Sequence, residues 1–349
     1  MRISTLLSYA GGFKEAAKEV AELEKAGLDV AWVPEAYSFD APSAMGYLAA
    51  RTERVVIASG ILPIYSRTPT LLAMTAAGVD YLSDGRCMLG IGASGPQVIE
   101  GFHGVPYHAP VARIREIIEI CRMVWRREKV EYAGKHYELP LSANKGSGLG
   151  KALKLINHPV RDEIPITVAA LGPKSVEMTA EIADGWLPAF YLPEGADDIW
   201  GDALRAGAAK RDPGRAPLEV YSGGMVGIGE GLEAERNRAR PQIALYVGGM
   251  GAKEKNFYNQ VFRRYGYEQE ADAIQSLYLE GRKDAAEAAI PDDYLARASL
   301  IGDPVFVRDR LQALKASGVT TLNVSFLGDS TEERVRQCDR LRDLVEQAG

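Results

Sequence analysis

Residues 1–35 read MRISTLLSYAGGFKEAAKEVAELEKAGLDVAWVPE, and this stretch decides the fold class. Residues 2–8 are mostly apolar, as in a buried strand, whereas residues 13–26 place apolar side chains at the 3.6-residue period of a helix. Gly27 is a helix stop signal, and a second apolar run follows at residues 30–33. A strand, a helix and another strand in this order predict a βαβ unit, whose strands lie parallel in one sheet.

The same alternation repeats along the chain and predicts six more strands. They are expected at residues 55–62, 86–91, 164–168, 185–187, 218–228 and 321–326. Helices are expected at residues 69–82, 111–125, 173–183 and 195–210, after Asp303, and after Ser330. Eight parallel strands that alternate with helices are typical of a (β/α)8 barrel, or TIM barrel. The sequence therefore predicts the α/β class, as a (β/α)8 barrel with insertions.

Two segments are too long for ordinary connections, so we expect them to be insertions in one domain that covers residues 1–349. Barrels of this class often run to more than about 250 residues as a single domain. A loop insert is expected near residues 140–163, and we interpret it as a flexible lid because long loops in barrels tend to lie near the site. A helical insertion, rich in tyrosine and arginine, is expected near residues 250–300.

Composition and charge narrow the classes of partner. The chain has 41 Lys and Arg against 47 Asp and Glu, a formal net charge of -6, and no run of basic residues interleaved with aromatic ones. We therefore expect no nucleic-acid partner. The N-terminal residues lack a signal-like cleavage site and no 18 apolar residues run together, so we expect a cytoplasmic protein with no membrane partner.

The cysteines and histidines show no pattern of a metal site. Cys87, Cys121 and Cys338 lie far apart on apolar faces of predicted elements, and we expect them in the core. None of the four histidines pairs with another ligand at metal spacing. We therefore expect no metal.

One strand end has a clear physical meaning. Residues 169–172, AALG, lead into a helix whose first turn contains Pro173 and Lys174. A helix start presents unpaired N–H groups and the positive end of a dipole, so it can bind an anion, and the lysine adds charge. The alternative is a tight strand-to-helix turn with proline at its usual first position.

Three strings of sequence carry a resemblance to a known family. They are SGPQVIEGFHGVPY at residues 94–107, HYELP at 136–140 and AALGPKSVEMTAEIADGWLP at 169–188. Together they resemble the luciferase-like superfamily, in its deazaflavin-dependent branch, which includes methylenetetrahydromethanopterin reductases and sugar-phosphate dehydrogenases. The likeness runs from the first strand to about Leu192 and returns in the last βα unit. It implies an oxidoreductase that binds coenzyme F420 and transfers a hydride between the deazaflavin C5 and a small organic substrate.

The resemblance also implies which residues bind this cofactor. They are Ala169, Ala170, Leu171 and Gly172 with Pro173 and Lys174 at the phosphate, Gly60 and Ile61 behind the central ring, and Ala93, Ser94 and Gln97 at the ring edge. Relatives carry a non-proline cis peptide bond after the third strand, and the matching bond here joins Gly60 to Ile61. A plain β-bulge is the alternative.

Two residues are candidates for proton transfer. Glu35 matches an acidic residue that a histidine follows in the sugar-phosphate dehydrogenases, but Ala36 stands at that position here. Glu35 is therefore either an acid or base, or a hydrogen-bonding group for the cofactor or a neighbouring loop. His103 is the second candidate, and a structural role at a helix end is its alternative. Tyr9 and Tyr65 follow strands one and three and either shape the substrate side or pack at the rim.

Two other functions are compatible with this sequence. An FMN-dependent monooxygenase of the same superfamily would share the barrel and the phosphate site. A non-catalytic barrel that binds or carries a cofactor is the third possibility, since a fold does not guarantee activity. The apolar and aromatic residues of the helical insertion would also permit a homodimer, which relatives commonly form.

Overall fold

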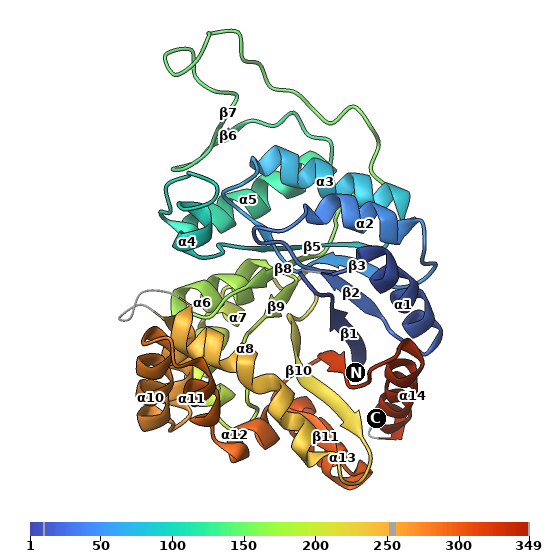
Figure 1. Ribbon diagram of the computed structural model, residues 1–349. Helices are drawn as coiled ribbons and strands as arrows, with labels where there is room; N and C mark the ends of the chain where they lie inside the picture. Colours follow the sequence, from blue (N-terminus) through green and yellow to red (C-terminus); the bar gives the residue numbers. More distant parts are fainter. Residues whose placement is uncertain (10, 251–255, 348–349) are drawn as a thin grey trace.

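The computed structural model describes residues 1–9, 11–250 and 256–347. Within these residues, eight parallel strands pair in sequence order, and the last strand pairs with the first, so the sheet closes into a barrel (Figure 1). The eight strands are β1 (Arg2–Leu6), β2 (Val30–Val33), β3 (Val56–Ser59), β5 (Cys87–Gly92), β8 (Ile166–Ala169), β9 (Gly185–Leu187), β10 (Glu219–Ile228) and β12 (Thr321–Phe326). Each overlaps a predicted strand, so the predicted (β/α)8 barrel is confirmed.

Four shorter strands accompany the barrel. β4 (Leu62–Pro63) continues the third barrel strand and pairs with β5, whereas β11 (Leu300–Gly302) pairs with the end of β10. β6 (Tyr132–Ala133) and β7 (Glu138–Leu139) form a small antiparallel hairpin outside the barrel. The sequence analysis did not predict β11.

Helices surround the barrel on its outside (Figure 1). They are α1 (Phe13–Lys25), α2 (Ala41–Ala49), α3 (Pro69–Leu82), α4 (Pro96–Ile99), α5 (Pro110–Trp125), α6 (Pro173–Ile182), the π-helix η1 (Asp197–Gly201), α7 (Asp202–Ala208), α13 (Pro304–Ala316) and α14 (Thr331–Gln347). Several begin where a side chain accepts a first-turn N–H, as Asp40, Thr68 and Asp303 do. The sequence did not predict α2 or α4.

Buried side chains fill part of the inside of the barrel. Trp32 and Tyr221 are fully buried there, with their rings edge to face at 5.0 Å, and Val30, Ala58 and Met88 pack around them. A second apolar layer lies between the strands and the helices, and it includes the three cysteines, all of them buried as predicted. In barrels of this class the site lies at the carboxyl ends of the strands.

The helical insertion lies between β10 and β11. Its elements are the 3₁₀-helix η2 (Glu233–Ala239), α8 (Arg240–Ala244), the π-helix η3 (Leu245–Gly249), α9 (Phe257–Arg264), α10 (Glu268–Leu279), α11 (Lys283–Ala288) and α12 (Asp292–Arg297). The sequence from residue 232 to about residue 289 reads as helical, in agreement with the start at Glu233, and residues 251–255 lie outside the described residues. Phe262, Ile274 and Tyr294 belong to an apolar cluster of its own.

The loop insert between β7 and β8 has neither helix nor strand, as predicted. Near its end, Arg161 forms an ion pair with the buried Asp80 at 2.5 Å and donates to the carbonyl of Cys87, the first residue of β5. These contacts lie at the amino ends of the strands, opposite the predicted site. The rest of the insert projects beyond α3 and α5 (Figure 1). The prediction of a lid is wrong for the segment around Arg161, because its polar contacts hold it at the amino ends of the strands.

Candidate functional site

Three of the predicted cofactor-binding segments meet at the carboxyl ends of neighbouring strands. An ideal Cβ placed on Gly92, the last residue of β5, would lie 2.5 Å from Cδ1 of Ile61 and 3.4 Å from Cβ of Ala169. The side chain of Ile61 therefore occupies the space that glycine leaves open. The segments after β3, β5 and β8 come together here, as the barrel requires.

The peptide bond between Gly60 and Ile61 is cis, as predicted. The amide of Gly60 donates to the carbonyl of Val33, at the end of β2, at 2.8 Å. A Cβ on Gly60 would lie 3.0 Å from Cβ of Trp32 and 3.1 Å from Cδ1 of Leu6. Glycine at this position thus allows the chain after β3 to lie closely against β1 and β2.

Two tryptophan side chains form hydrogen bonds to the backbone of the turn between β8 and α6. Trp186 donates to the carbonyl of Ala170 and Trp200 donates to the carbonyl of Leu171, each at 2.9 Å. Gly172 is the N-cap of α6, in extended conformation. The amides of Leu171 and Gly172 donate to no other group of the residues that the structure describes. A rigid turn with free N–H groups at a helix start is a suitable anion site.

The other two members of the predicted phosphate group extend this turn. Pro173 is the first helical residue of α6, and both Pro173 and Lys174 are exposed. The insertion borders the turn from the other side, since a Cβ on Gly172 would lie 3.9 Å from Cε1 of Phe257. The predicted anion site is therefore placed between the barrel and the insertion.

The residues predicted at the ring edge lie in and before α4. Ala93 and Ser94 are half-buried, and Ser94 adopts a left-handed conformation with φ of 57°. Tyr107 donates to the carbonyl of Ser94 at 3.4 Å. Gln97 is exposed on α4, and its Oε1 lies 3.3 Å from an ideal Cβ on Gly95. The role of these residues at a ring edge stays a prediction.

Glu35 is engaged by an ion pair that the sequence analysis did not identify. Arg67 donates to both carboxylate oxygens, at 2.5 and 2.8 Å, and the amide of Ala41 donates to one of them at 2.8 Å. Both side chains are buried, with exposed fractions of 7% and 14%. This arrangement favours a positioning role for Glu35, because its carboxylate joins the loop after β2 to the loop after β4.

His103 lies just after α4, where its amide donates to the carbonyl of Val98 at 3.2 Å. Its ring contacts Phe102 at 5.2 Å between centroids. Its Nε2 is enclosed and has no hydrogen-bond partner among the described residues. The backbone contact agrees with a helix-end role, and the free Nε2 leaves the proton-transfer hypothesis open for experiment.

Aromatic side chains from distant segments surround the same end of the barrel. Phe190, which follows β9, packs against Tyr246 at 5.9 Å and Tyr258 at 5.6 Å between ring centroids. Tyr9, which follows β1, shares a hydrogen bond with Tyr246. On the opposite side, Tyr65 packs against Tyr107 at 5.1 Å. The sequence analysis named Tyr9 and Tyr65 but missed the tyrosines of the insertion, for which only the tyrosine-rich composition was a signal.

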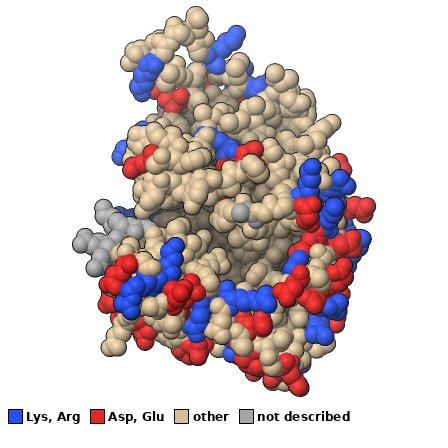
Figure 2. Space-filling view, in the orientation of Figure 1, with Lys and Arg blue, Asp and Glu red and all other residues tan. Residues whose placement is uncertain are grey.

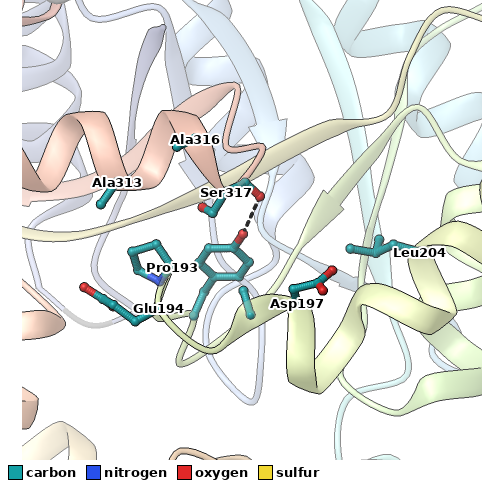
Figure 3. Close-up of a pocket in the computed structure, with 9 residues that line it drawn as sticks. Pro193, Glu194, Asp197, Leu204, Ala313, Ala316 and Ser317 are labelled. Carbon is teal, nitrogen blue, oxygen red and sulfur yellow. Dashed lines mark hydrogen bonds between the residues drawn. The ribbon is translucent and has the colours of Figure 1, made fainter.

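The described residues were also compared with the requirements of a metal site, a membrane helix and a second pocket. No group of three or more His, Cys, Asp and Glu residues in these ranges could hold a metal ion, and no helix in them is long and apolar enough to cross a membrane. A pocket of about 470 Å³ lies between η1 and α13 (Figure 3). Tyr191 forms part of it and donates to the carbonyl of Ser317 at 2.9 Å. That carbonyl precedes β12, so this pocket lies away from the predicted site.

Comparisons with known proteins agree with this geometry. The family model described as "Luciferase-like monooxygenase" matches residues 1–321. A Mycobacterium tuberculosis protein named "Putative coenzyme F420-dependent oxidoreductase Rv3520c" is 42% identical over 93% of this chain and 95% of its own length. A 5,10-methylenetetrahydromethanopterin reductase of Archaeoglobus fulgidus is 26% identical over 85% of each chain.

Solved structures show the same fold. The coenzyme F420-dependent tetrahydromethanopterin reductase of Methanopyrus kandleri superposes with a TM-score of 0.82 at 20% identity, over 100% of this chain and 99% of that one. An F420-dependent secondary alcohol dehydrogenase, in complex with an F420-acetone adduct, superposes with a TM-score of 0.70 at 16% identity, over 100% and 99%. With its barrel and its matched residues 1–321, the chain belongs to the luciferase-like monooxygenase family.

Proposed function

We propose that this protein is a coenzyme F420-dependent oxidoreductase that transfers a hydride between the deazaflavin C5 and a small organic substrate. One observation carries the proposal. The turn of residues 169–172, in which the amides of Leu171 and Gly172 have no acceptor among the described residues, lies across Gly92 from the cis bond at Ile61. A ligand with a phosphate and a flat ring system fits this pair of features, and the 42% identical relative is named for that cofactor.

The residues present fit such a cofactor. When bound, coenzyme F420 supplies a ring carbon that donates or accepts a hydride. The turn before α6 would hold the phosphate with its N–H groups and with Lys174, while Ile61 would support one face of the ring. Glycine at position 92 leaves the space that the side chain of Ile61 occupies. The contribution of the protein is therefore orientation and exclusion of water.

An FMN-dependent monooxygenase is the alternative, because the family includes such enzymes. The FMN complex of 3,6-diketocamphane monooxygenase superposes on this chain with a TM-score of 0.66 at 17% identity, over 100% of this chain and 98% of that one. The first experiment is a titration of the purified protein with F420 and, in parallel, with FMN, in which the fluorescence of each is followed. Tight F420 binding with weak FMN binding supports the proposal, and a preference for FMN overturns it.

A matched pair of glycine variants tests the location of the site. Gly92→Val would place a branched side chain against Ile61 and Ala169, so we expect loss of F420 binding. Gly46→Ala is the control, because a Cβ at Gly46 in α2 meets no atom within 4 Å. Equal F420 binding by both variants would contradict the location. A carrier without activity is tested separately, by turnover of the cofactor-loaded protein with ketones, enones and alcohols.

We also propose that the protein is a homodimer of cytosolic location. The outward face of α3 exposes Leu71, Met74, Tyr81 and Leu82, and a Cβ on Gly78 of the same face meets no atom within 4 Å. The single charged residue of α3 faces inward. An uncharged helix face of this kind fits a second copy of itself, since no charge has to be buried. Buried, unpaired cysteines support the location.

Sedimentation velocity tests the dimer. Met74→Glu introduces a charge on the α3 face, so we expect this variant to sediment as a monomer while the parent protein sediments as a dimer. Leu279→Glu is the control, since Leu279 is a similarly exposed apolar residue at the end of α10. A monomeric parent protein, or a Met74→Glu variant that remains dimeric, would refute this interface.

A further inference from the structure

Three tyrosines that lie far apart in the sequence meet at the carboxyl ends of the strands. Tyr9 follows β1, Tyr246 is in η3 and Tyr258 is in α9. The rings of Tyr246 and Tyr258 meet edge to face at 4.8 Å, and Tyr9 is joined to Tyr246 by a hydrogen bond between their hydroxyls. We call Tyr9, Tyr246 and Tyr258 the tyrosine cluster.

One buried amide holds the backbone at two members of this cluster. Asn256, with an exposed fraction of 2%, donates to the carbonyl of Tyr246 at 2.8 Å and accepts from the amide of Tyr258 at 2.9 Å. Phe190 packs against both rings and has a φ of 57°, a conformation that bulky residues rarely adopt. The positions of Tyr246 and Tyr258 are therefore set by the surrounding structure, as in a preorganised binding site.

The hydroxyls of Tyr9 and Tyr246 have raised pKa values. Burial raises the pKa of Tyr9 to about 12 and raises the pKa of Tyr246 as well. Each of the two hydroxyls can act as a donor or as an acceptor. Both hydroxyls therefore keep their protons at neutral pH, and the hydroxyl of Tyr246 can donate to a ligand.

The tyrosine cluster borders the phosphate end of the proposed cofactor site. At the ring-edge segment, the Tyr107 hydroxyl donates to the carbonyl of Ser94. Phe257, the residue before Tyr258, lies beside Gly172 in the phosphate turn. The cluster therefore faces the cofactor position from the side of the insertion.

The surroundings of the cluster carry little net charge. Figure 2 shows this face hollowed between the part with α4 and the helical insertion, and the hollow is lined almost wholly by uncharged side chains. The carboxylate of Glu35 is neutralised by Arg67. A charged substrate placed against aromatic rings here would lose its hydration without a partner, which is costly. Flat, uncharged compounds instead gain from stacking on the rings.

We propose that the tyrosine cluster is the substrate-binding wall of this site, and that it binds a flat, uncharged carbonyl compound whose oxygen accepts a hydrogen bond from the Tyr246 hydroxyl. This proposal rests on the proposed function, because the substrate would lie between the cluster and the cofactor. In this proposal the helical insertion selects the substrate and the barrel binds the cofactor. The two parts of the site can therefore be tested separately.

The experiment measures binding of small probes to the protein loaded with oxidised F420. Acetophenone is the neutral carbonyl probe, benzoate is a charged probe with the same ring, and ethylbenzene has the ring without the carbonyl. Titration calorimetry gives each dissociation constant. We expect acetophenone to bind at least about tenfold more tightly than benzoate, because a carboxylate would be desolvated without a cation.

Two variants separate the hydroxyl from the ring. Tyr246→Phe should weaken acetophenone binding about three- to tenfold, the value of one neutral hydrogen bond, and leave ethylbenzene binding unchanged. Tyr278→Phe is the control, because Tyr278 belongs to the same insertion but packs against Gly248 and Gly249, outside the cluster. It should change neither dissociation constant.

The outcomes distinguish the two proposals. If the protein binds no F420, the proposed function fails and the inference fails with it. If F420 binds normally but benzoate binds as tightly as acetophenone, the inference alone is overturned. The same conclusion follows if Tyr246→Phe has no larger effect than Tyr278→Phe.

Discussion

Replacing Arg67 by methionine would leave a carboxylate buried without its partner. In the native protein Arg67 binds both oxygens of Glu35, and the amide of Ala41 supplies a third hydrogen bond. Methionine has a similar length and no charge, so Arg67→Met removes the two guanidinium bonds and little volume. The side chain of Glu35 is only 7% exposed, and water therefore replaces the lost bonds poorly.

The expected size of the effect follows from this burial. Breaking a buried ion pair by removal of one partner costs about 3–5 kcal/mol. Unfolding entropy scales with chain length, at about 2.1 cal/mol/K per residue. For a chain of 349 residues, the loss corresponds to a fall in Tm of about 4–7 °C. We expect this shift in a thermal melt of Arg67→Met followed by circular dichroism.

Two further variants make the interpretation specific. Arg205→Met removes an arginine whose ion pairs with Asp197 and Asp202 are exposed, and it should leave Tm unchanged. In the double variant Glu35→Gln with Arg67→Met, no charge is buried, so part of the lost stability should return. Two results would refute our reasoning. One is a Tm of Arg67→Met equal to that of Arg205→Met, and the other is a Tm of the double variant below that of Arg67→Met.

Three more predictions concern the turn, the strand contacts and the core. Gly90→Ala should destabilise the protein by about 3 kcal/mol in urea unfolding, because its Cβ would lie 1.8 Å from the carbonyl oxygen of Ser59, and an unchanged midpoint would contradict this. Lys174→Ala should weaken F420 binding about three- to tenfold in a fluorescence titration with Tm unchanged, since the lysine is exposed, and equal affinity would argue against its role. Burial raises the pKa of Cys121 from 9.0 to about 12, so stability present below pH 9 should decline as the pH rises toward 12, and less steeply in Cys121→Ala.

Much of the fold could be predicted because its signals are local. The bounds of α3 agree with the predicted 69–82, where Thr68 caps the first turn, proline follows it, and the apolar period ends at Leu82. All eight barrel strands were predicted from apolar runs between turn residues. Such features depend on residues within a few positions of each other, so they can be predicted from a single sequence.

Parts of the candidate site were also predictable, for different reasons. The phosphate turn follows from a helix start after a barrel strand, which is a local pattern with a known physical consequence. The cis bond at Gly60 and Ile61 could not be derived from local pattern. It was predicted from the resemblance to a family, and the structure contains it.

The sequence by itself thus determined the barrel, its strand ends and the turn before α6, because periodicity and capping act over short distances. Only the tertiary structure decided that Arg67 neutralises Glu35, 32 positions away, and that Tyr9 and Tyr246 share a hydrogen bond. It also decided that the loop insert is anchored at the amino ends of the strands, through Arg161 and Asp80. The physical reason is the same in each case. Partners that are distant in sequence are selected by how whole elements pack, and no local pattern encodes that packing.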